Sequence, residues 1–156
     1  MKKQIKFSYE LVGTGWSKCV LETDKGSVTT TASYLDDALG NLCKALYEII
    51  CGKEYSQAIF TEEPGEYRWV FKKINNDSMK LQILEYDDLW LGLPDEDGKL
   101  IYEDKFKIKR FVQAFIRGIN RLLTDVTQIA SKLECKIYFA NWNAKFLIIT
   151  NFGDTP

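Results

Sequence analysis

SYLDDALGNLCKALYEIICG, residues 33–52, is the clearest helix signal in this chain. Its apolar side chains recur at steps of three and four residues, which places them on one face of a helix: Leu35, Leu39, Leu42, Leu46 and Ile49. Ser33 followed by Asp36 predicts a capping box, and Gly52 stands where a left-handed residue commonly ends a helix. We therefore expect an amphipathic helix over 33–52, with its apolar face packed on neighbouring strands.

The segments before this helix have the alternating pattern of strands. Residues 4–12 place apolar and polar side chains in turn, and Gly13-Thr14-Gly15 interrupts them as a hairpin turn. Residues 16–23 form the return strand, and residues 27–32, which are rich in β-branched side chains, form a third. The N-terminal third of the chain thus predicts a three-stranded meander that leads into the helix.

A second meander is predicted after the helix. Its strands are residues 58–61, 67–72 and 79–83, with turns at 62–65 and 75–77. An acidic, loop-like segment follows at 87–98, and residues 99–102 suggest a short strand. A second helical region spans Lys105–Leu133, where Phe111, Phe115, Ile119 and Leu122 keep helical spacing. The apolar runs between Cys135 and Phe152 fit either strands or a short helix.

These elements predict one α+β domain over residues 1–156. We expect a single antiparallel twisted sheet of about six strands, built from the two meanders, with the two long helices packed on one of its faces. The helical apolar positions should form the core: Leu39, Leu42, Leu46, Phe111, Phe115, Ile119 and Leu122.

Composition excludes several classes of protein. The formal net charge of −1 gives no general attraction to nucleic acid or to an anionic membrane, so neither is expected as a partner. No apolar run is long enough to cross a bilayer, and the N-terminus lacks the apolar core of a secretory signal. The cysteines show no metal-type spacing. We therefore expect a cytoplasmic protein with reduced thiols.

Catalytic chemistry has little support in the sequence. The chain contains no histidine, which removes the commonest general base and zinc ligand. Asp36 and Asp37 are better explained as acids that favour the start of a helix. The run 95–98 lacks the ligand spacing of a calcium loop. We expect no enzymatic activity, no cofactor and no bound metal.

Three stretches resemble a family. They are Gly13-Thr14-Gly15-Trp16-Ser17, residues 32–39 (ASYLDDAL) and residues 63–69 (EPGEYRW). In this order they resemble a group of small, mostly uncharacterised bacterial proteins that are similar to immunity-type proteins encoded beside polymorphic secreted toxins. The resemblance covers about the first two thirds of the chain. It implies a cytosolic, non-enzymatic protein that binds and occludes a toxin domain.

A partner-binding surface is predicted on the two acidic, turn-rich segments. Clustered acids would speed capture of a basic toxin groove, and two rings, Tyr67 and Trp90, would anchor it. The predicted contact residues are Glu62, Glu63, Glu66, Tyr67, Asp87, Asp88, Trp90, Asp95, Glu96 and Asp97. The alternative is that these acids only keep a loop soluble.

Two other functions remain open from the sequence. A pocket between sheet and helices would favour a small-molecule-binding or enzymatic domain. A sheet edge or the long helix could instead serve an oligomeric structural subunit. The surplus of aromatic residues fits core packing or an exposed patch: Trp16, Tyr34, Tyr67, Trp69, Tyr86, Trp90, Trp142 and Phe146.

Overall fold

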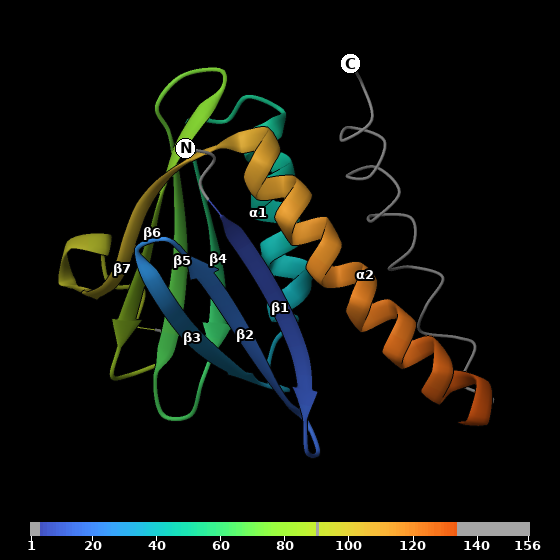
Figure 1. Cartoon of the computed structure of the whole chain (residues 1–156). Coiled ribbons are helices and arrows are strands. Elements are labelled where there is room, and N and C mark those ends of the chain that lie inside the picture. Colours follow the sequence, from blue (N-terminus) through green and yellow to red (C-terminus); the bar gives the residue numbers. More distant parts are fainter. Residues whose placement is uncertain (1–3, 90, 134–156) are drawn as a thin grey trace.

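The computed structural model describes residues 4–89 and 91–133, and this part of the chain contains two antiparallel sheets and two α-helices (Figure 1). The α+β class is confirmed, but the strands form two sheets rather than the single sheet expected. The first sheet has the order β1(Ile5–Val12), β2(Trp16–Thr23), β3(Gly26–Ser33). The second has the order β4(Tyr55–Thr61), β5(Glu66–Lys73), β6(Ser78–Tyr86), β7(Lys99–Lys107). The helices are α1(Ala38–Ile50) and α2(Ile108–Leu133), and a short 3-10 helix, η1, covers Asp95–Asp97.

The β1–β2 hairpin turns where the sequence predicts. Val12 pairs directly with Trp16, and the turn between them has Gly13 and Gly15 at φ 58° and 82°. These are left-handed backbone conformations that glycine adopts at least cost. The glycines therefore allow the tight return that brings the ends of β1 and β2 together.

Helix α1 begins later than the sequence predicts. Asp37 is its N-cap, with Oδ1 accepting a hydrogen bond from the Gly40 N–H at 2.8 Å, so the predicted capping box at Ser33 and Asp36 is wrong. Ser33 is instead the last residue of β3 and pairs with Trp16. Because strand pairing holds the backbone extended up to Ser33, the helix cannot start there. The predicted end is confirmed, since Gly52 follows the helix with φ 104°.

Strand β7 is longer than the predicted segment 99–102. It pairs with β6 along Lys99–Lys107, so residues 105–107, expected as the first turn of the second helix, are strand. Alternation explains the difference, because Asp104, Phe106 and Ile108 are buried while the residues between them are exposed. The chain therefore has seven strands within its described residues, and α2 begins only at Ile108.

Each helix packs mainly on an edge strand of a different sheet, not together on one face. Helix α1 lies on β4, and α2 runs beside β1 (Figure 1). A Cβ at Gly118 would lie 2.4 Å from the Phe7 carbonyl oxygen, so α2 approaches β1 closely there. Side chains also form hydrogen bonds with backbone groups of β4. Asn41 donates to the Ile59 carbonyl, and Asp36 accepts from the Thr61 N–H. Parts of both edges are thus unavailable for strand pairing with another molecule.

One core joins both sheets and both helices. Trp69 on β5 is fully buried, lies 6.3 Å from the ring of Phe7 on β1, and donates its indole N–H to Thr30 on β3. Phe7 in turn contacts Phe115 of α2 at 5.0 Å. The predicted core positions Leu39, Leu42, Leu46, Phe111, Phe115 and Ile119 are buried, and Leu122 is half-buried at its margin. By contrast, Leu35 is 41% exposed, because it precedes the helix.

Three of the four cysteines lie within the described residues. Cys19 and Cys43 are buried, and Cys51 is exposed. Burial raises the pKa of the Cys19 thiol well above its usual value.

Neither helix of the described part is both long and apolar enough to cross a membrane.

Candidate partner-binding surface

The fold brings the two predicted acidic segments together. Residues 62–65 form the β4–β5 turn, and a Cβ at Gly65 would lie 2.1 Å from the Tyr86 carbonyl oxygen and 3.3 Å from the Asp87 carbonyl carbon. The turn therefore packs against the end of β6, where the second acidic segment begins. Both segments border the same end of the four-stranded sheet (Figure 1). This end presents the carboxylates Glu63, Asp87 and Asp88 to solvent.

The ten predicted contact residues differ widely in exposure. Glu63, Asp87, Asp88, Glu96 and Asp97 are exposed, Glu62, Tyr67 and Asp95 are half-buried, and Glu66 is buried. Trp90 lies outside the described residues. The exposed five are available for contact with a partner as the chain stands, whereas Glu66 is not.

Glu66 is buried because it pairs with Arg68 on the same strand. Arg68 Nη2 donates to Glu66 Oε1 at 2.7 Å, Nη1 donates to the Leu93 carbonyl at 2.7 Å, and the guanidinium lies 4.2 Å from the Tyr86 ring centre. Desolvation would lower the pKa of Arg68, but the hydrogen bond to Glu66 raises it above its usual value. The pair satisfies two buried charges, although Arg68 Nε has no hydrogen-bond partner within the described residues.

Asp95 has a structural contact of the same kind. Its carboxylate lies 3.4 Å from Arg68 Nη1 and 3.6 Å from Lys72 Nζ, and it accepts from the Tyr55 hydroxyl at 3.1 Å. Burial, reinforced by the nearby Asp95 charge, raises the pKa of Tyr55 to about 12. The described residues of 87–98, which we call the strap, are thus tied to the outer face of the four-stranded sheet. The strap covers a small second core of Val70, Leu84 and Tyr86.

Tyr67 is not an exposed anchor. Its side chain is half-buried and packs against the main core. Burial, together with the neighbouring carboxylates of Glu62 and Glu85, raises the pKa of Tyr67 to about 12. The aromatic contribution to a binding surface must therefore come from other residues.

Exposed apolar side chains gather instead around the β1–β2 hairpin. Ten large apolar side chains are exposed in the described residues, and half of them lie here: Leu11, Val12, Trp16, Tyr34 and Leu35, the hairpin cluster. Tyr34 is 74% exposed. A Cβ at Gly15 would lie 3.0 Å from its ring, so the ring rests on the hairpin turn. Such a gathering of exposed apolar groups is a common mark of a protein-interaction site.

The hairpin cluster is connected to the acidic end by a chain of contacts. Directly after Leu35, Asp36 accepts hydrogen bonds from the Thr61 N–H at 3.3 Å and from its hydroxyl at 2.6 Å. Thr31 of β3 donates to Glu62 in the adjacent turn. Burial raises the pKa of Asp36 above its usual value, although the bonds from Thr61 oppose that shift. Apolar and acidic groups therefore border one another at this end of the molecule.

Sequence reasoning missed the hairpin cluster as a site. Trp16 and Tyr34 stand out in the aromatic surplus, but burial of a ring depends on what packs over it. One local signal was available, since two of the three residues of the Gly13–Gly15 turn have no side chain that could cover their neighbours.

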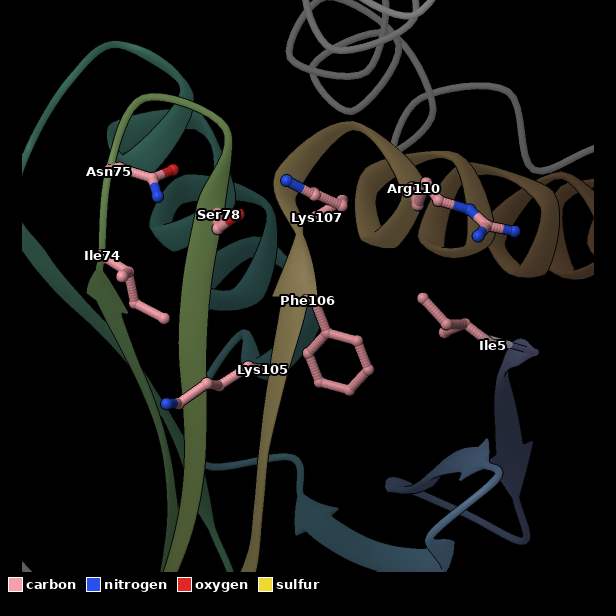
Figure 2. A pocket seen from close by; sticks show the side chains of 8 residues that line it. All are labelled: Ile5, Ile74, Asn75, Ser78, Lys105, Phe106, Lys107 and Arg110. Atoms are coloured by element: carbon pink, nitrogen blue, oxygen red, sulfur yellow. The ribbon is translucent and has the colours of Figure 1, made fainter. Parts of the chain in front are cut away.

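A separate cavity of about 350 Å³ lies at the opposite end of the second sheet, beside the β5–β6 turn and the start of α2 (Figure 2). The cationic side chains around it do not point toward one another. Lys105 and Lys107 point to one side of β7, and Arg110 points to the other side, as does Phe106. Lys107 is also paired with Asp77. This arrangement does not favour a site for a small ligand, which needs polar groups aimed at one point.

Comparisons with known proteins provide no family for this chain. No protein-family model, no curated protein and no solved structure matches it. Within the described residues, no group of three or more acidic or cysteine side chains is arranged to hold a metal ion. The candidate site therefore rests on its geometry and charge.

Proposed function

We propose that this chain is a non-enzymatic, cytoplasmic binding protein that neutralises a basic bacterial toxin domain. The observation that carries the proposal is the packing of the 62–65 turn against the end of β6, which merges two acidic segments into one surface. The resemblance of three sequence stretches to immunity-type proteins supports a toxin as the partner.

Charge explains how this surface would work. A toxin that acts on nucleic acid tends to have a basic groove, because its substrate is polyanionic. The exposed carboxylates Glu63, Asp87 and Asp88 would attract that groove and raise the association rate. Occluding the groove needs no chemistry from the binding protein. Neutralisation is therefore compatible with a chain that has no histidine.

The test is binding to an inactivated toxin domain encoded beside this chain's gene, measured by stopped-flow and calorimetry. Asp87→Lys with Asp88→Lys should slow association by about tenfold or more at low salt and weaken its salt dependence. Asp95 is unsuitable for reversal, because it holds the strap through Arg68. The matched control is Asp24→Lys with Glu54→Lys, which changes the net charge equally. Asp24 lies in the β2–β3 turn and Glu54 directly precedes β4, so each is at the end of its sheet away from the β1–β2 and β4–β5 turns. That control should retain most of the association rate.

Two results would contradict the proposal. One is a parent chain that does not bind the toxin domain or protect its substrate. The other is an equal loss of association rate in both double variants, which would show that only net charge matters and not this surface.

A further inference from the structure

We infer that the hairpin cluster is the apolar anchor of this binding surface, and that it fits a partner protein whose cationic groups border an apolar hollow. The inference rests on the proposed function and specifies which part of the surface supplies affinity. Acids raise the association rate, but most binding energy at protein interfaces comes from a few rings that become desolvated.

The cluster is presented in a defined position rather than on a free loop. Val12 and Trp16 are a directly opposed pair at the end of two hydrogen-bonded strands. Tyr34 follows the last residue of β3 and rests on Gly15. The N–H of Leu35 donates to the Ser33 hydroxyl at 3.4 Å. Because the backbone around these side chains is held, little ordering would oppose their burial by a partner.

The surrounding charges select the partner. Two exposed acids, Glu10 and Asp37, lie next to the cluster in sequence, and a third, Glu63, follows Glu62, which accepts a hydrogen bond from Thr31 of β3. A second copy of this chain would bring like charges together, which disfavours self-association through this surface. A partner with lysine or arginine around an apolar hollow would instead satisfy both features. The occupant is therefore a basic protein surface.

The experiment uses the full, ¹⁵N-labelled chain and two synthetic basic peptides of equal length and charge. One is made of lysine and leucine, and the other carries serine in place of leucine. We expect the lysine–leucine peptide to bind about tenfold more tightly and to shift the amide signals of residues 11–16, 34 and 35. Trp16→Ser with Tyr34→Ala should abolish the difference between the peptides. The control pair Tyr47→Ala with Leu100→Ser, which also removes exposed apolar groups, should retain it.

Several results would overturn the inference. Equal binding of both peptides by the parent would show that the acids alone attract the ligand. If the parent binds neither peptide, or if the hairpin variant still prefers the lysine–leucine peptide, the anchor is excluded. If Trp142→Ser shifts the hairpin signals of the unbound protein, the chain's own C-terminal residues occupy the cluster. If dilution shifts them, a second copy does.

Failure of the anchor and failure of the function give different results. A toxin domain that binds Trp16→Ser with Tyr34→Ala as tightly as the parent leaves the proposed function standing and removes the anchor. A parent that binds the lysine–leucine peptide at the hairpin, but does not bind the toxin domain, supports the apolar anchor and removes toxin neutralisation.

Discussion

The two faces of strand β5 are both buried, but for different physical reasons. On the inner face, Trp69 and Phe71 lie among apolar side chains from both sheets and both helices. On the outer face, Arg68 is only 6% exposed by its side chain, because Glu66, Tyr86 and the strap surround it. The inner face is stabilised by removal of apolar surface from water, whereas the outer face combines a small apolar cluster with buried charges that must stay paired.

This difference shows that an acidic segment is not always a free, solvated loop. Asp95 comes from the most acidic stretch of the chain, yet its carboxylate contacts Arg68, Lys72 and Tyr55. Exposed neighbours such as Asp87 and Asp88 have no such role in the described structure. A single segment therefore combines a structural clamp with acids that are available to a partner.

The largest expected effect is on the inner face. Trp69→Ala should lower the free energy of unfolding by about 3–5 kcal/mol, because it removes a fully buried ring and leaves a cavity between the sheets. Chemical denaturation of the purified variant measures this loss. Trp16→Ala, at a ring that is 37% exposed, is the matched control and should change stability far less. Equal losses in the two variants would show that the sheets do not share the core described.

A substitution on the outer face should lower the free energy of unfolding by nearly as much, but a second substitution should restore part of it. Arg68→Ala leaves Glu66 as a buried, unpaired carboxylate, which we expect to cost about 3 kcal/mol. Adding Glu66→Gln removes that charge and should restore part of the stability, as a double-mutant cycle would measure. Lys72→Ala, which removes a more exposed partner of Asp95, serves as the control and should cost less than about 1 kcal/mol. Additive losses for Arg68 and Glu66 would contradict a coupled pair.

The smallest expected effect is a change in the pKa of one of two tyrosines that have similar pKa values. Burial raises the pKa of Tyr9 to about 12 on the core side, and burial with Asp95 raises the pKa of Tyr55 to about 12 on the strap side. Asp95→Asn should therefore lower the pKa of Tyr55 and leave that of Tyr9 unchanged, as a titration followed by NMR would show. Unaltered titration of Tyr55 would mean that Asp95 does not hold the strap against it.

Tyr9 also sets an alkaline limit on stability. A tyrosine in an unfolded chain ionises with its ordinary pKa of 10.0, while the pKa of Tyr9 in the folded chain is about 12. The folded state thus keeps a proton that the unfolded state loses, so this contribution is complete below pH 10 and falls as pH rises from 10 to 12.

Local sequence determined the periodic features of this protein. Alternation predicted β5 as a strand over residues 67–72, and helical spacing predicted Leu42, Phe111 and Phe115 in the core, because these patterns depend only on the geometry of one strand or helix. The resemblance and the acidic segments suggested a function that the structure leaves as a proposal. The convergence of those segments at one end was not readable from either of them.

Tertiary packing decided the features that join distant parts of the chain. Because Ser33 pairs with Trp16, the helix is capped at Asp37 and not at Ser33. Because Arg68 contacts Asp95, 27 residues away, part of the acidic loop is held on the sheet. The exposure of Trp16 and Tyr34 was likewise decided by the absence of a covering segment among the described residues. Burial and pairing are properties of what lies across space, and the residue types next to one another in sequence do not contain that information.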